Sequence, residues 1–354
     1  MSVLYSHLKF VGFPSHIKAF TEKTLAPPVH VRLKPMNHCN HDCWYCAYRI
    51  SNLELGENID LKDRIPEDKL LEIVDDLVEI GVRAVTFSGG GEPLLHKAIP
   101  AAVQKLAEGG VKVGCLTNGS NLKGKVAEAF LRYGTWVRIS TDGWSDESFS
   151  RIRNIQGDEF SRIVANISNF ASQNSNCTIG ISLIVTGENY EHVFEICQIF
   201  KNAGVNHVAI SGVVTSNAGE DNNKYHMNIR KDVNNQIDKA MGLVESGFSI
   251  INRYHELTSR FDKNYTQCPT IQFTPVIGAD CKVYTCHDKA YTDSGLLGSI
   301  ANKRFKDFWF SEENRVKVFG LNPSQVCGHH CIAHYKNLMI NEYSELENDH
   351  SVFV

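Results

Sequence analysis

Three cysteines and two histidines lie close together near the start of the chain, in the segment NHCNHDCWYC. Cys39, Cys43 and Cys46 have the spacing C-x3-C-x2-C. A closed structural metal site normally has four ligands, so three thiols leave one position to be filled. Zinc with His38 or His41 as its fourth ligand is one interpretation. The other is a [4Fe–4S] cluster on three thiolates, whose fourth iron is open to an exogenous ligand.

A second group of thiols lies late in the chain, and its members are Cys268, Cys281, Cys286, Cys327 and Cys331. These five are too close together in sequence to be explained by packing alone, and either a structural zinc ion or a second iron–sulfur cluster would account for them. Cys115, Cys177 and Cys197 stand alone in apolar segments and are predicted to be core residues.

The bulk composition is that of a globular protein of 354 residues, with 21% charged residues and a net charge of −4. No block of lysine and arginine is present, so we expect no nucleic-acid partner. The N-terminus lacks a signal pattern and no apolar run is long enough to span a bilayer, which predicts a cytoplasmic protein without membrane contact. Disulfides are rare in that compartment.

Strand and helix patterns alternate along the first part of the chain. Strands are predicted at 29–36, 83–91, 111–117, 136–141, 177–185 and 207–213, and helices at 66–81, 97–109, 121–133, 158–172 and 189–203. Such alternation implies a parallel sheet with right-handed crossovers. Six units of this kind form either an open doubly wound sheet or a partial barrel.

The pattern changes after the sixth strand, where residues 214–229 are polar and are predicted to be a loop, followed by a helix at 230–246. The predicted divisions are an N-terminal preamble at 1–28, a partial barrel at 29–213, a linker and helix at 214–249, and a metal-binding domain at 250–354.

The early cysteine segment resembles the signature of the radical S-adenosylmethionine (radical SAM) enzymes, which have an aromatic residue, here Tyr45, before the last cysteine. The segment Ser88, Gly89, Gly90, Gly91 and Glu92, followed by proline, is similar to the G-G-E-P motif of that family. The resemblance implies an α/β fold with a partial (β/α)6 TIM-like barrel. It also implies that S-adenosylmethionine (SAM) chelates the open iron and is cleaved to a 5′-deoxyadenosyl radical that abstracts a substrate hydrogen.

The resemblance also implies that Tyr45 and residues 88–92 contact SAM. Further candidates for SAM contacts lie at the ends of later strands, and they are Asn118, Ser140, Asp142, Arg153, Ser182 and Ser211. Strand ends are where barrel sites are built. Turn chemistry is the alternative for Asn118 and Asp142, and a surface ion pair is the alternative for Arg153.

The late cysteines resemble a SPASM or twitch extension that holds an auxiliary [4Fe–4S] cluster. Five thiols suit one such cluster, which makes two clusters in the whole chain. The ligands implied are Cys268, Cys286, Cys327 and Cys331, with Cys281 as an alternate. The neighbouring residues His287, Asp288, Tyr291, His329, His330 and His334 either tune this cluster or form a solvated loop.

The resemblance as a whole implies an oxidoreductase in which the auxiliary cluster accepts an electron from the substrate. We expect a small substrate such as a sugar or cyclitol, because no separate peptide-recognition domain precedes the first strand, and a flavodoxin or ferredoxin as electron donor. A peptide-modifying enzyme is the alternative, and a cyclase of molybdopterin synthesis is disfavoured. A non-catalytic metal-binding scaffold is the interpretation from a different class.

Overall fold

The structure is a computed structural model, and it describes residues 6–50, 53–173, 175–255, 260–346 and 353. The first five residues of the predicted preamble therefore lie outside the described residues.

One curved sheet of ten strands organises the chain, in the order β10-β9-β8-β1-β2-β3-β4-β5-β6-β7. Strands β1 to β8 run parallel, and β9 and β10 are antiparallel additions at one edge. The strands are β1 His30–Leu33, β2 Ala84–Phe87, β3 Lys112–Thr117, β4 Trp136–Ser140, β5 Thr178–Val185, β6 His207–Gly212, β7 Ser249–Asn252, β8 Val276–Ile277, β9 Lys282–Tyr284 and β10 Leu296–Ser299.

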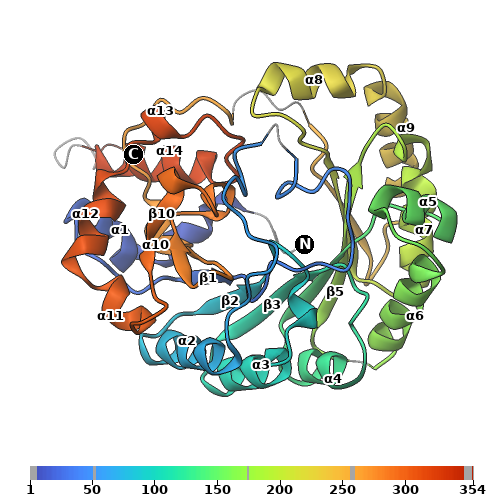
Figure 1. Cartoon of the computed structure of the whole chain (residues 1–354). Coiled ribbons are helices and arrows are strands. Elements are labelled where there is room, and N and C mark those ends of the chain that lie inside the picture. The colour runs from blue at the N-terminus through green and yellow to red at the C-terminus, as the bar shows by residue number, and fades with distance from the viewer. Residues whose placement is uncertain (1–5, 51–52, 174, 256–259, 347–352, 354) are drawn as a thin grey trace.

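The helices α2, α3, α4, α6 and α7 follow the outer side of this sheet, whereas α11, α12 and α14 gather with α1 beside its β10 edge (Figure 1). The helices are α1 Pro14–Thr21, α2 Glu67–Glu79, α3 Ile99–Glu108, α4 Gly124–Tyr133, α5 Asp146–Arg153, α6 Glu159–Ala171, α7 Val193–Asn202, α8 Gly219–Met227, α9 Arg230–Met241, α10 Thr270–Phe273, α11 Phe305–Trp309, α12 Glu312–Gly320, α13 Pro323–Val326 and α14 His334–Ser344.

The sequence of α2 shows why these helices pack as they do. Leu70, Ile73, Val74 and Leu77 recur at helical spacing and are fully buried. The helix stops before Gly81, which has a φ of +82° that a residue with a side chain rarely adopts.

The strands have two different faces, as β1 illustrates. Val31 and Leu33 are fully buried in the main hydrophobic core with the outer helices. His30 and Arg32 alternate with them and therefore point to the inner side of the curved sheet. The inner face thus carries polar side chains where a cavity can form.

The predicted α/β class with a parallel sheet and partial barrel is confirmed. The predicted loop at 214–229 is wrong, since it contains α8. The predicted division at residue 250 stays a prediction. β7 crosses it, and β8 pairs with β1, so the C-terminal segment continues the same sheet. No helix in the described part of the chain has the length and hydropathy needed to cross a membrane.

Candidate metal centres

Residues 37–46 carry the early cysteines and are called the cysteine loop. Hydrogen bonds join this segment and its preceding residue to residues 88–93, the glycine loop. The Gly91 N–H donates to the Met36 carbonyl at 3.2 Å, and the Glu92 N–H donates to the His38 carbonyl at 2.9 Å. A Cβ atom on Gly91 would lie 2.0 Å from the His38 oxygen. The glycines therefore permit close contact between the two loops.

The Glu92 side chain links the loop after β2 to the carboxyl end of β3 in the protein interior. Its buried carboxylate accepts hydrogen bonds from the Thr117 hydroxyl at 2.6 Å, the Asn118 N–H at 2.7 Å and the Leu94 N–H at 2.9 Å. Burial raises the pKa of Glu92 to about 7, although these hydrogen bonds act in the opposite direction. Most of its acceptor capacity is used by protein groups, so positioning of the glycine loop is the role that the geometry supports directly.

A buried polar network connects the cysteine loop to β4 and α5. The Arg153 guanidinium donates to the Asp142 carboxylate at 2.5 Å and to Cys43 Sγ at 3.3 Å. The Tyr45 hydroxyl also donates to Asp142, and the Ile184 N–H donates to it at 2.8 Å. The side chains of Arg153 and Asp142 are 5% and 0% exposed, so the surface ion pair considered for Arg153 is excluded.

The early thiols are not arranged tightly around the position of a single ion in this structure. A tetrahedral zinc ion with bonds of about 2.3 Å holds its sulfurs about 3.8 Å apart. In the described chain, no three ligand atoms that include Cys39, Cys43 or Cys46 lie within 4.8 Å of one another. Burial raises the pKa of Cys39 to about 11, so a bound metal is needed to hold that sulfur as a thiolate at neutral pH.

Among the other SAM candidates, Ser140 ends β4, Ser211 lies next to the end of β6 and Asn118 directly follows β3, whereas Ser182 lies within β5. Ser140 and Ser182 are paired across β4 and β5, while Ser211 pairs with Ile184 across β5 and β6. The Asn118 side chain donates to the Asn40 side-chain oxygen at 2.9 Å, which ties it to the cysteine loop. Their predicted contacts with SAM remain predictions.

The late cysteines Cys268, Cys286, Cys327 and Cys331 line one cavity of about 590 Å³, which we call the lumen cavity. Burial raises the pKa of Cys286, and so do the neighbouring Asp288 and the other three thiols. The four sulfurs therefore lie close enough to repel one another when ionised, which is a charge that a metal cluster would neutralise.

The fifth late cysteine lies elsewhere. Cys281 is at the turn between β8 and β9, with a φ of +55°, and packs into the main core. Its charged neighbours are Lys69, Asp280, Asp63 and Glu72, and no thiol is among them. The structure therefore does not bring the predicted alternate ligand to the other four.

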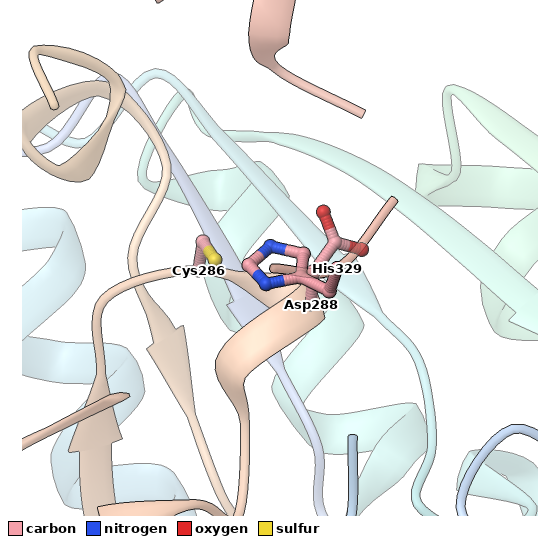
Figure 2. Close-up of side chains that lie close together, drawn as sticks. All are labelled: Cys286, Asp288 and His329. Carbon is pink, nitrogen blue, oxygen red and sulfur yellow. The ribbon is translucent and has the colours of Figure 1, made fainter. Parts of the chain in front are cut away.

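Cys286, Asp288 and His329 also line the lumen cavity. Their side chains form a tighter group, as Figure 2 shows. One ligand atom from each lies within 4.8 Å of the others, which suits a single metal ion. Both ring nitrogens of His329 are buried without a hydrogen-bond partner. Cys286 cannot serve this ion and a four-thiolate cluster in the same way, so the two arrangements are alternatives.

Sequence reasoning missed the basic side chains on the inner face of the sheet. Arg32 on β1, Arg138 on β4 and His207 on β6 line the lumen cavity. The alternation of polar and apolar residues in the strand segments HVRL and WVRIS could have indicated these side chains. Successive residues of a strand point to opposite faces of the sheet, so the polar ones had to point away from the outer helices.

Comparisons with known proteins match the part of the chain that contains the cysteine loop and the glycine loop. Residues 33–200 match the model of the radical SAM superfamily. An "S-adenosylmethionine-dependent nucleotide dehydratase" of Lacinutrix mariniflava is 31% identical over 114 residues, which are 32% of this chain and 23% of that protein. A "Probable GTP 3′,8-cyclase" of Sulfolobus acidocaldarius is 25% identical over 83% of this chain and 93% of its own length. This chain thus spans less than a quarter of the length of the dehydratase.

Among solved structures, Streptococcus suis SuiB bound to its precursor peptide SuiA aligns with a TM-score of 0.63 at 16% identity, over 96% of this chain and 79% of that one. At this identity the likeness concerns the fold alone. The matched family model covers the cysteine loop, the glycine loop and the strands that position them. Residues 33–200 of this chain thus form a radical SAM domain.

Proposed function

We propose that this chain is a cytoplasmic radical SAM oxidoreductase that acts on a small metabolite. Cys39, Cys43 and Cys46 would hold a [4Fe–4S] cluster with one iron open to SAM. When bound, these groups supply a 5′-deoxyadenosyl radical that removes a hydrogen atom from the substrate. The observation that carries the proposal is the locked pair of cysteine and glycine loops within residues that match the superfamily model.

The chain's own residues would orient and tune this centre. The hydrogen bonds from the glycine loop fix the cysteine loop at the carboxyl ends of β1 and β2. The hydrogen bond from Arg153 to Cys43 Sγ favours negative charge on that sulfur. Asp142 fixes the guanidinium in place and keeps the buried pair neutral overall.

Electron acceptance would be the task of the second centre. Cys268, Cys286, Cys327 and Cys331 would hold an auxiliary [4Fe–4S] cluster in the part of the lumen cavity that they line. The substrate radical would lose one electron to this centre and one proton to a base, which completes a two-electron oxidation. A flavodoxin or ferredoxin would supply the electron that starts the cycle.

A small substrate is supported by the size of the lumen cavity, because its volume of about 590 Å³, which the auxiliary cluster would share, lies within the range of small-ligand sites. Two relatives are named for GTP or a nucleotide. A peptide substrate is the second candidate, because the aligned Streptococcus suis structure is described as bound to a precursor peptide. Nothing in the cavity favours a neutral sugar or cyclitol in particular.

Two sets of alanine variants test the two centres after anaerobic reconstitution. We expect about eight iron atoms in the wild type and about four when either the early or the late cysteines are replaced. The late-cysteine variant should still form 5′-deoxyadenosine but should yield no oxidised product. Full product formation by that variant would refute the electron-accepting role, and intact clusters without any SAM cleavage would favour a scaffold.

A further inference from the structure

The lumen cavity has a strongly one-sided charge. Among the residues that the structure describes, its lining includes five basic side chains and one carboxylate, and these are Lys9, Arg32, Arg138, Lys263, Lys336 and Asp288. A cavity with low-dielectric walls and one sign of charge concentrates ligands of the opposite sign. The question is which anion these cations serve.

Part of the charge faces the late thiols. Lys263 lies near Cys327 and Cys331, whose ionised forms would raise its pKa. It also donates to three backbone carbonyls, one of them that of His329 at 2.8 Å. The positive charge of Lys263 is therefore explained by its contacts with the auxiliary site and the loop around it.

Arg138 and His207 lie away from that site, on the sheet itself. Arg138 on β4 and His207 on β6 are both in register with Gly180 on β5, which stands between them. Two strand spacings place their Cα atoms about 10 Å apart. A Cβ on Gly180 would lie 2.2 Å from the His207 ring, so the glycine leaves room for that ring.

The His207 ring has unused hydrogen-bonding capacity. Its side chain is 7% exposed and its Nδ1 atom is buried without a hydrogen-bond partner. Burial, followed by the charge of Arg138, lowers its pKa to about 4, so the ring is neutral and can donate one hydrogen bond at neutral pH.

A third cation approaches from β1. Burial lowers the pKa of Arg32, and the nearby charge of Arg138 lowers it further, whereas Asp288 acts more strongly than Arg138 in the opposite direction. Guanidinium groups match the oxygens of phosphate and carboxylate groups with paired hydrogen bonds. A bound oxyanion would offset the mutual repulsion.

We propose that Arg138 and His207, with Arg32 facing them, form the seat for the oxyanion group of the substrate, so that the enzyme acts on a phosphorylated or carboxylated small molecule. This inference rests on the proposed function, because it takes the lumen cavity as the substrate chamber. It identifies the substrate class as anionic rather than as a neutral sugar or cyclitol.

Binding of three matched probes to the reconstituted protein tests this proposal by calorimetry. Glucose 6-phosphate carries a phosphate, gluconate carries a carboxylate, and glucose carries neither. We expect at least one charged probe to bind and glucose not to bind, and the stronger of the two charged probes identifies the oxyanion. Equal binding of glucose, or no binding of either charged probe, would overturn the proposal.

Substitutions assign the seat to its residues. Arg138→Gln should weaken the charged probe by about tenfold or more, and Arg138→Lys should weaken it less. Arg132→Gln, on the exposed face of α4, removes the same charge outside the cavity and should have no effect. Unchanged affinity in Arg138→Gln would overturn the assignment.

Iron content and 5′-deoxyadenosine formation are measured on the same preparations. If the wild type binds iron and cleaves SAM but binds no anion, this inference fails alone. If it neither binds iron nor cleaves SAM, the proposed function fails.

Discussion

Replacement of Arg153 by glutamine should lower the reduction potential of the first cluster. The guanidinium lies 3.3 Å from Cys43 Sγ in a buried position. At an effective dielectric constant of about 20, a full charge on that sulfur would interact with it by about 5 kcal/mol. An added electron spreads over the cluster, so about a quarter of this energy, near 1.3 kcal/mol, responds to reduction, which corresponds to about 50 mV.

Asp142→Asn provides a matched control with the opposite sign. It removes the negative charge that offsets Arg153 and should therefore raise the potential. The double variant Arg153→Gln/Asp142→Asn leaves no unpaired buried charge, which matters because breaking a buried ion pair costs about 3–5 kcal/mol of stability. Its potential should lie between those of the two single variants.

The assay is an anaerobic potentiometric titration monitored by electron paramagnetic resonance, without SAM and with the late cysteines replaced so that one cluster is observed. Shifts of the same sign in Arg153→Gln and Asp142→Asn, or no shift in either, would refute the reasoning. A common sign would indicate a general disturbance of the cysteine loop instead of an electrostatic effect.

Three further predictions concern Gly91, Asp76 and Glu92. Gly91→Ala places a Cβ 2.0 Å from a carbonyl of the cysteine loop, so iron analysis should show the loss of about four iron atoms, while Gly320→Ala, with open space around it, should retain them. Asp76→Ala should lower the free energy of unfolding in denaturant by about 1–3 kcal/mol, because this buried carboxylate accepts hydrogen bonds from the N–H groups at the start of α11, while its partner Arg304 can turn to solvent. Asp75→Ala, which breaks an exposed ion pair, should cost less than about 1 kcal/mol, and equal costs would contradict this prediction. Burial raises the pKa of Glu92 from 4.5 to about 7, so its contribution to stability is present below about pH 4.5 and is lost as the pH rises through 7. In denaturant titrations, the free energy of unfolding of the wild type relative to Glu92→Gln should therefore fall by about 3 kcal/mol between pH 4.5 and 8. A difference that stays constant with pH would contradict this prediction.

Local sequence patterns are sufficient to predict the parallel strands and the cysteine loop. The apolar alternation of β1 and the helical spacing in α2 depend on neighbours along the chain, which a sequence displays directly. The spacing of Cys39, Cys43 and Cys46 is likewise local. These features can therefore be predicted from the order of the residues alone.

Helix α8 was missed because it buries almost no apolar surface. Its buried members are Asn222 and His226, and it is fixed by hydrogen bonds. Asn222 accepts from the Thr215 N–H and donates to the Ala218 carbonyl, while His226 contacts the Val213 carbonyl. Hydrophobic periodicity does not reveal such hydrogen bonds.

The basic seat and the loop-to-loop contact depend on register between distant strands. Arg138, Gly180 and His207 are separated by a helix or more in sequence and meet only because β4, β5 and β6 pair in this order. The same holds for the approach of Gly91 to the cysteine loop. Composition alone, with a net charge of −4, gave no indication of a basic cavity.

The most direct test of the central claim is the formation of 5′-deoxyadenosine by the reconstituted protein after addition of dithionite and SAM. The wild type should produce it together with methionine. The variant Cys39→Ala/Cys43→Ala/Cys46→Ala, with its late cysteines intact, should produce none. Equal formation by this variant, or a wild type that holds one zinc ion at these thiols and leaves SAM intact, would contradict the assignment of the first site.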